Sequence, residues 1–499
     1  MATTVVEIER KYDVDEHVPF PDLVGLPDAA RVDPRAPFML SATYYDTEDL
    51  DLIRSGITLR RRTGGEDAGW HLELPVNGER HELQVLLGDV SEEPPPELTA
   101  ILRGVVRDRP LVGVGAVDTR RTSTLLRAAD GRLLAEVSDD RVTGRRLGAD
   151  RREPEGWREW EVEFDVDRDG LADELERRLL AAGARPSARR AKLARILAAT
   201  SPPAPGVATR KSKQTTASAA LAPYLATQVA ELVRLDPLVR ADVPDAVHRM
   251  RVAGRRVRAV LGTYRGMFDR ARTAPLRVEV KWLVDELGRP RDLEVLRDRL
   301  DVVLDSRGST VGADISAEHG AAHRAAVEAM TSPRYFSLID SLRDLIETPA
   351  WSSRAGKPAH KQLRAALVKD VRHLERAVAR ASRTTGTHDR ALRLHDVRKA
   401  AKRIRYSVEA VEAVEAVVPV FGAGAERFAA ILADMQEVLG DHHDAVVTRI
   451  EVLQLAERHP DLSVAAALSD LDAATAVQEH AYERTVRRLL RPKSRRWLR

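Results

Sequence analysis

Charged side chains alternate with other residues in several short segments near the start of the chain. Glu7, Glu9 and Lys11 are each separated by one residue. In an extended strand every second side chain lies on the same face, so two carboxylates and an ammonium group would share one face. The same spacing recurs in three more pairs: Arg60 and Arg62, Arg80 and Glu82, and Glu161 and Glu163. Carboxylates in such an arrangement can hold a hard divalent cation, and the basic groups can hold phosphate oxygens.

The elements that carry these pairs are predicted to be strands. One strand with alternating charge usually indicates only a solvated sheet face, but its recurrence favours a closed antiparallel sheet with a charged interior. Strand formers and turn residues place the strands at 5–12, 42–47, 57–62, 70–74, 80–86, 117–127, 132–142 and 158–166. Asn77-Gly78 and Asp130-Gly131 are hairpin signals. With helices expected at 98–106, 171–182 and 188–199, we predict an eight-stranded antiparallel tunnel with helical caps.

The rest of the chain differs in charge and in pattern. Residues 1–200 contain 39 acidic and 30 basic side chains, whereas residues 201–499 contain 38 acidic and 50 basic ones, giving net charges of −9 and +12. A basic second part indicates a polyanionic partner. We therefore predict an α+β multidomain protein, with a tunnel domain at 1–200, a Pro-rich linker at 201–212, an all-α domain at 213–490 and a frayed basic tail at 491–499.

Composition excludes several classes of protein. The chain has no cysteine, so disulfides, thiolate metal sites and a cysteine nucleophile are excluded. We find no run of about 18 apolar residues and no charged-then-apolar leader, and so we expect no membrane span. We expect a cytoplasmic protein. The sequence leaves its oligomeric state open.

The second part contains an internal repeat rich in basic residues. The pattern His-x-x-Arg-x-x-x-basic-basic-x-Arg occurs at 248–258 and again at 395–405, and Leu287-Gly288 and Leu439-Gly440 begin a second matching stretch. At about 100° per residue, the repeated positions lie within one arc of a helix surface. The two predicted stripes are His248, Arg251, Arg255 and Arg258, and His395, Arg398, Lys402 and Arg405. Stacked like charges destabilise a bare helix, and a bound polyanion would relieve that repulsion.

Two other interpretations of the stripes remain open. A charge run is often only a solvated face whose acids come from neighbouring helices. Nucleic acid is a second possible ligand, but this part has few aromatic residues on which bases could stack, so we consider it the weaker alternative. Duplication of the same stripe favours a specific anion site.

The motifs of the first part resemble the CYTH domain, the family of triphosphate tunnel metalloenzymes. The ordered set runs through Glu7, Glu9, Lys11, Tyr45-Asp46-Thr47, Arg60, Arg62, Arg80, Glu82, Glu136, Glu161, Glu163 and Lys192. The resemblance implies hydrolysis of inorganic triphosphate or a related compound with Mg²⁺ or Mn²⁺; some members are adenylate cyclases. Water activated by the metal would attack a terminal phosphorus.

The resemblance also implies roles for individual residues. The expected metal ligands are Glu7, Glu9, Glu136, Asp140, Glu161 and Glu163. The expected catalytic residues are Glu7, Glu9, Lys11, Glu161 and Glu163. The expected substrate-binding residues are Arg60, Arg62, Arg80, Glu82, Arg120 and Lys192. One departure stands out: members commonly carry a lysine where this chain has Glu73. A carboxylate there would remove a phosphate contact and add repulsion.

The repeat of the second part resembles the CHAD domain, an α-helical module of two pseudo-symmetric four-helix halves that binds inorganic polyphosphate. The resemblance covers about 213–490 and implies association with polyphosphate granules. The residues it assigns to polyphosphate are His248, Arg251, Arg255, Arg256, Arg258, Arg291, His395, Arg398, Lys399, Lys402, Arg403 and Arg405. In the second copy His443 replaces an arginine, and we expect weaker binding there above the pKa of that histidine.

Taken together, these residues predict a metal-dependent triphosphatase whose helical part binds polyphosphate. The alternative is a non-catalytic polyphosphate-binding or targeting protein, in which Glu73 has weakened the tunnel site.

Overall fold

The chain forms two compact units, Met1–Gly206 and Val207–Arg499, which are described separately below. The computed structural model describes residues 3–76, 79–86, 93–148, 153–164, 169–187, 191–197, 215–303, 310–384, 387–412, 420–458 and 463–498. The side chains of 3–8, 79–80, 169, 310, 387–388 and 412 are outside this description. The predicted linker at 201–212 and the predicted turn at Asn77-Gly78 therefore lie outside the described residues.

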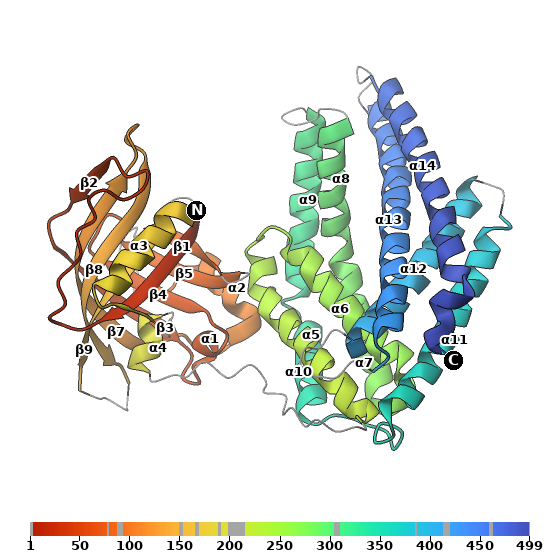
Figure 1. Ribbon diagram of the computed structural model, residues 1–499, viewed down its shortest axis with the longest axis horizontal. Helices are drawn as coiled ribbons and strands as arrows, with labels where there is room; N and C mark the ends of the chain where they lie inside the picture. The colour runs from red at the N-terminus through yellow and green to blue at the C-terminus, as the bar shows by residue number, and fades with distance from the viewer. Residues whose placement is uncertain are drawn as a thin grey trace. The chain divides into compact units, whose positions relative to one another are not determined.

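The first unit is built on one antiparallel sheet (Figure 1). Its strands are β1 (Thr3–Val14), β2 (Arg31–Pro34), β3 (Phe38–Asp46), β4 (Thr58–Thr63), β5 (Gly69–Val76), β6 (Glu79–Leu86), β7 (Val112–Arg127), β8 (Leu133–Arg146), β9 (Glu155–Phe164) and β10 (Arg185–Pro186). The eight predicted strands are confirmed. The prediction missed β2 and β10, which are only four and two residues long and contain no alternating pattern.

Strand β1 joins the two ends of this sheet. The pairing order runs β1-β6-β5-β4-β3-β7-β8-β9, and β9 pairs with β1 again. Residues 3–7 of β1 pair with β6, and residues 8–14 pair with β9. The ring is thus connected through two successive stretches of one strand, and no described residue of β1 pairs with both β6 and β9.

Four helices accompany the sheet. They are α1 (Asp51–Arg54), α2 (Pro96–Val106), α3 (Asp169–Ala181) and α4 (Lys192–Ile196). Helix α3 lies across the outer face of the sheet, where its Leu175 and Leu179 pack with Trp160 of β9 in a buried core (Figure 1). Because Trp160 points outward, its neighbours Glu159 and Glu161 point to the inner face.

Helix α4 is shorter than predicted, with five residues instead of twelve, and it rests on two glycines of the sheet. A Cβ atom at Gly115 would lie 2.9 Å from Leu193, and one at Gly144 would lie 2.7 Å from Ile196 and 2.9 Å from Trp157. The bare backbone at these two positions lets α4 approach the strands closely. This approach places Lys192, the first residue of α4, among the carboxylates of the inner face.

The second unit is helical, as predicted. Its helices are α5 (Ala217–Arg240), α6 (Ala246–Thr263), α7 (Arg270–Glu286), α8 (Gly288–Val303), α9 (Thr310–Ala329), α10 (Pro333–Glu347), α11 (Ala359–Ala381), α12 (Thr387–Glu412), α13 (Ala423–Arg458) and α14 (Ala465–Leu490). None of the helices that the structure describes has the length and apolar character needed to cross a membrane.

The two copies of the repeat differ in one helix. In the first copy the chain breaks between α7 and α8 at Leu287, whereas α13 runs unbroken through the matching position, Leu439. Pro290 explains the break, because it has no backbone N–H to donate to the carbonyl four residues earlier. The second copy carries His442 at that place and continues.

The C-terminal segment is not frayed over the residues described, contrary to our expectation. Residues Pro492–Leu498 form a 3₁₀ helix, and the ring of Trp497 packs 5.3 Å from Phe421 and 5.6 Å from Phe428. Arg495 forms an ion pair with Glu375. The charge-based prediction failed because it gave no weight to this single aromatic anchor.

We predict that Gly144→Val lowers the free energy of unfolding of the first unit by about 1–3 kcal/mol, because the added carbons displace α4 from the sheet. Gly156→Val on the neighbouring strand is the matched control, since no atom lies within 4 Å of a Cβ placed there. Thermal unfolding of both variants checks this. Equal melting temperatures for the two variants would contradict it.

Candidate functional site

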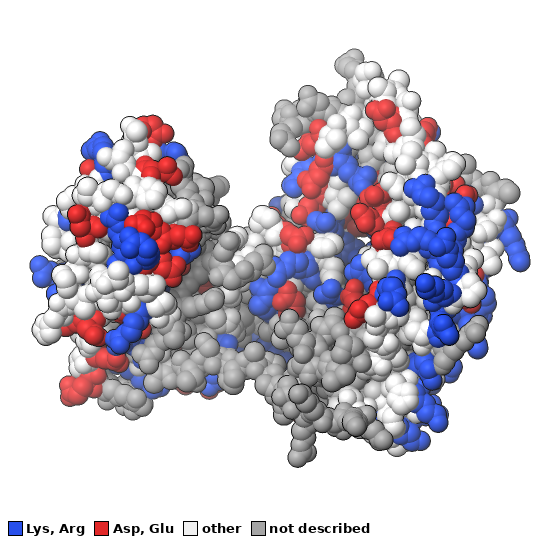
Figure 2. Space-filling model, in the orientation of Figure 1, with Lys and Arg blue, Asp and Glu red and all other residues white. Residues whose placement is uncertain are grey.

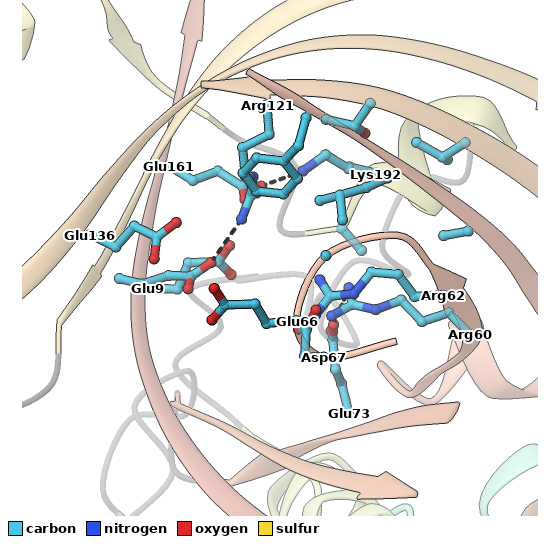
Figure 3. A pocket seen from close by; sticks show the side chains of 18 of the residues that line it. Glu9, Arg60, Arg62, Glu66, Asp67, Glu73, Arg121, Glu136, Glu161 and Lys192 are labelled. Carbon is cyan, nitrogen blue, oxygen red and sulfur yellow. Dashed lines mark hydrogen bonds and ion pairs between the residues drawn. The ribbon is translucent and has the colours of Figure 1, made fainter. Parts of the chain in front are cut away.

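The inner face of the sheet encloses a cavity of about 690 Å³ that is lined mainly by charged side chains (Figure 3). Among the described residues, the basic ones that line it are Lys11, Arg35, Arg60, Arg62, Arg121 and Lys192. The acidic ones are Glu9, Glu66, Asp67, Glu73, Glu136, Glu161 and Glu163. Seven carboxylates therefore face six cations, and the alternation predicted from the sequence accounts for six of these thirteen positions.

Three glutamates of β1 and β9 form one group that could hold a metal ion. Glu9, Glu161 and Glu163 each offer a carboxylate oxygen, and these oxygens lie within 4.8 Å of one another. Burial raises the pKa of Glu163 to about 7; Arg121 opposes this rise, and the carboxylates of Glu9 and Glu161 add to it. Glu136 lines the same part of the cavity (Figure 3). The donor set is all oxygen, which suits Mg²⁺ or Mn²⁺.

Glu161 is the point where the cations of the site converge. It accepts from Lys11, from Arg121 and, at 2.6 Å, from Lys192. Burial disfavours its charge, but these three cations hold the pKa of Glu161 well below its usual range. The pKa of Lys192 is raised because Glu159, Glu161 and Asp140 outweigh its own burial.

Asp140 occupies a different position from the one expected of a metal ligand. It is fully buried, and Arg121 binds both of its oxygens at 2.8 Å. Asp140, Glu159 and Glu161 form a second group of close carboxylates, but the Lys192 ammonium lies 2.6–3.0 Å from all three. A protein cation already balances this second group.

Arg120 was predicted to face the substrate, and the structure shows that it does not. Arg120 is exposed on the outer face of β7, whereas its neighbour Arg121 points into the cavity. Adjacent residues of a strand point to opposite faces, so only one of the two arginines can be inside. The choice follows from the register of β7 on β8, which sets Arg121 opposite Asp140 and is not visible in the sequence.

The other side of the cavity holds Arg60 and Arg62 of β4 (Figure 3). Arg60 forms ion pairs with Glu73 at 2.7 Å and with Glu82 at 3.0 Å. Burial, reinforced by Arg60, lowers the pKa of Arg62 to about 10, and Arg62 forms an ion pair with Asp67. Glu73, which stands where family members commonly have a lysine, therefore faces the cavity. There it partly neutralises Arg60, a predicted phosphate ligand.

Two predicted residues can be placed only by their backbone. Glu7 of β1 lies opposite Arg80 of β6 in the strand register, and their side chains are outside the described structure. His71 of β5 is buried beside Glu82, with which it shares a hydrogen bond, and burial lowers its pKa.

Sequence reasoning missed Arg121, Glu159 and the pair Glu66 and Asp67. Glu159 continues the alternation of Glu161 and Glu163, so the period of two contained a signal for it. Glu66 and Asp67 lie between β4 and β5 and have no periodic signal.

In the second unit the two basic stripes lie on α6 and α12, and their charges influence one another. Arg251 of α6 donates to the carbonyl of Gly288 at 3.1 Å and to Asp292 at 3.2 Å. Arg398 of α12 lies against Gly440, the matching glycine of the second copy. The repeated Leu-Gly motif thus provides a bare surface for one arginine of each stripe.

Four cations of the stripes form no hydrogen bond or ion pair with the residues that the structure describes. They are Arg255, Arg258, Arg398 and Lys402. Burial, followed by repulsion from Arg398 and Arg255, lowers the pKa of Lys402 to about 7. Burial and the charge of Lys399 lower the pKa of His395 to about 4, and the His395 ring lies 4.8 Å from His443.

Other predicted polyphosphate ligands are engaged with acids. Arg256 and Arg405 both approach Glu409, at 3.6 and 3.0 Å, and Arg403 approaches Asp370 at 3.0 Å. Arg291 pairs with Glu294 at 2.8 Å. His248 and Arg258 belong to the α6 stripe, and Lys399 is exposed on α12. One face of the unit shows many basic side chains on the side of α12 and α14, interspersed with acids (Figure 2).

Comparison with known proteins identifies the two units. A CYTH domain model matches residues 6–188, and a CHAD domain model matches residues 223–453. The chain belongs to the CYTH and CHAD families, with one domain of each. Both resemblances that the sequence motifs indicated are confirmed.

One relative matches nearly the whole chain, and two solved structures match about half of it. The uncharacterised protein Rv2226 of Mycobacterium tuberculosis is 36% identical over 485 residues, which cover 90% of this chain and 89% of the relative. Among solved structures, PptA from Streptomyces chartreusis is 23% identical with a TM-score of 0.42, covering 55% of this chain and 98% of its own. The CHAD domain from Ricinus communis is 24% identical with a TM-score of 0.37, covering 57% and 92%.

We predict that Lys402→Met raises the melting temperature of the CHAD unit by about 2–4 °C at pH 6.5. The pKa of Lys402 is lower in the folded protein than in the unfolded chain, so the charged form of this lysine destabilises the fold. This destabilisation is fully present below pH 7 and disappears as pH rises towards 10.5. The gain should therefore shrink at high pH. Lys399→Met, an exposed position on the same helix, is the control, and a gain independent of pH would contradict the prediction.

Proposed function

We propose that the CYTH unit hydrolyses inorganic triphosphate, or a related triphosphate, with Mg²⁺ or Mn²⁺. One observation carries this proposal: the carboxylates of Glu9, Glu161 and Glu163 line the same cavity as three cations. These cations are Lys11, Arg121 and Lys192. Carboxylates suit a divalent cation, and the basic groups suit the oxygens of a phosphate chain.

The balance of charge explains why a metal is needed. With seven acids against six bases among the described lining residues, the cavity by itself does not attract a polyanion. Glu9, Glu161 and Glu163 would hold the ion, with Glu136 beside them. When bound, a divalent cation neutralises phosphate oxygens and lowers the pKa of a coordinated water.

The protein's own residues would then bind and orient the substrate. Lys11 now lies 2.6 Å from Glu9 and also pairs with Glu161. Once a divalent cation neutralises these carboxylates, Lys11 would become available to phosphate oxygens. Arg62, whose charge is poorly solvated, would contact the far end of the chain. No side-chain nucleophile is required, because positioning and electrostatic stabilisation supply most of the catalysis of phosphoryl transfer.

We further propose that the CHAD unit binds inorganic polyphosphate at the meeting point of its two stripes. Arg255, Arg398 and Lys402 carry the argument, since their charges are partly buried and lack partners among the described residues. Leaving like charges together in a low-dielectric site is costly unless an anion binds there. A flexible polyanion without bases fits a surface with few aromatic rings. Cytoplasmic location and association with polyphosphate granules would follow from this ligand.

We expect Glu9→Gln to lower the rate of phosphate release from tripolyphosphate by about 100-fold or more, because one ligand of the carboxylate group is lost. Polyphosphate binding by the CHAD unit should be unchanged. Glu155→Gln, an exposed glutamate at the start of β9, is the control. If Glu9→Gln keeps the wild-type rate with both Mg²⁺ and Mn²⁺, the metal site is wrongly assigned.

A non-catalytic polyphosphate-binding protein is the second candidate, and the Glu73–Arg60 ion pair favours it. Two carboxylates already neutralise Arg60, so a phosphate must compete with them. In this case the wild type would release no phosphate from tripolyphosphate, ATP or thiamine triphosphate, while still binding polyphosphate. Glu73→Lys would then restore release.

For an active enzyme, we expect Glu73→Gln to lower the KM for tripolyphosphate by about tenfold, because one carboxylate that competes with phosphate for Arg60 loses its charge. Steady-state kinetics with saturating metal measure this change. Glu66→Gln is the control, since Glu66 lines the same cavity but pairs with Arg35. A similar change in both variants would show a general effect of cavity charge instead.

A further inference from the structure

The two basic stripes end differently, although the sequence repeat makes their ends equivalent. Arg258 of α6 corresponds to Arg405 of α12, and Gly262 corresponds to Glu409, four residues later in each helix. In the second copy Glu409 neutralises this end, because it lies 3.0 Å from Arg405 and 3.6 Å from Arg256. In the first copy the acid is missing from this position.

Arg258 consequently remains without a protein partner. It forms no hydrogen bond or ion pair with the described residues, and the charged groups that influence it are Asp285 and Arg277 of α7. Asp285 is itself engaged with Lys281, one turn away on the same helix. The acid that acts on Arg258 is therefore shared with Lys281, and the charge of Arg277 acts on Arg258 as a repulsion.

Arg277 lies across the bare backbone of Gly262. A Cβ atom at Gly262 would lie 3.3 Å from Nη2 of Arg277 and 3.7 Å from its Nε. The Nε of Arg277 is buried and has no hydrogen-bond partner among the described residues. The glycine that replaces Glu409 in the first copy thus removes an acid and also makes room for a second guanidinium.

The surroundings add further positive charge. Burial and the charges of Arg403, Arg265 and Arg270 act on Arg277 and lower its pKa. Arg403 is held by Asp370 and Thr263, whereas Arg265 and Arg270 are exposed. Such a group of guanidinium ions is unfavourable unless an anion with several oxygens lies among them.

We infer that Arg258 and Arg277 form an additional phosphate-binding subsite, which lets a polyphosphate chain continue past Gly262 at the end of the α6 stripe but not past Glu409 at the end of the α12 stripe. This inference rests on the proposed binding of polyphosphate by the CHAD unit. It makes the two stripes unequal, since an internal ion pair closes the end of the α12 stripe, whereas the end of the α6 stripe remains open. The subsite would be filled only by chains longer than those that Arg255, Arg398 and Lys402 can hold.

The test uses the full chain, with polyphosphates of increasing length, in EDTA so that the metal-dependent cavity of the CYTH unit takes no part. We expect Arg277→Gln to weaken the binding of long chains by about tenfold and to leave short chains unaffected. The slope of log affinity against log salt should fall by about one for long chains, as expected when one phosphate contact is lost. Gly262→Glu, which copies the second repeat, should have the same effect.

The control is Arg272→Gln, an arginine of the same helix that pairs with Asp344. If Arg277→Gln and Gly262→Glu bind long chains with the affinity and salt slope of the wild type, the subsite does not exist, although the proposed function stands. Lys402→Met should still weaken every chain length in that case. If the wild type binds no polyphosphate of any length, both the proposed function and this inference are overturned.

Discussion

Buried charge needs a counter-charge, and this requirement governs both units of the protein. Inside the CYTH sheet it is met by protein groups: Lys11, Arg121 and Lys192 meet at Glu161, and Lys192 balances a further pair of carboxylates. The group of Glu9, Glu161 and Glu163 is less completely balanced, which is seen in the raised pKa of Glu163. In the CHAD unit the requirement is met less completely, because Arg255, Arg398 and Lys402 form no ion pair with the described residues and repel one another. One unit is thus suited to take up a cation together with an anion, and the other to take up an anion alone.

The scaffold matters because it fixes which charged side chains meet. Strand β1 presents Glu9 and Lys11 to the cavity while it pairs with β9, and β9 presents Glu161 and Glu163 opposite them. Lys192 reaches the site only because Gly115 and Gly144 have no side chains. Glycines serve the CHAD unit in the same way, since Gly288 and Gly440 each lie against an arginine of a stripe.

Much of this could be predicted from the sequence, because the charged strands and the basic helices each have a characteristic spacing of charged residues. Alternation by two identified the charged strands, and spacing by three and four identified the stripes of α6 and α12. Register could not be predicted in the same way, and it decided that Arg121 rather than Arg120 faces the cavity. Partner choice was equally hidden: Arg256, Arg403 and Arg405 looked like ligands for an anion until Glu409 and Asp370 were seen beside them. Glu73 was recognised as a departure, but its pairing with Arg60 required the fold.

The single proline that separates α7 from α8 gives the two repeats different mechanical properties. Helix α13, with its 36 residues, forms an uninterrupted rod of about 54 Å, whereas the matching part of the first repeat has a joint at Leu287. A joint allows two shorter segments to tilt independently, and a rod transmits any displacement from one end to the other. The duplicated halves are therefore no longer interchangeable: the first has a joint beside Arg251 at Gly288, and the second is continuous beside Arg398 at Gly440.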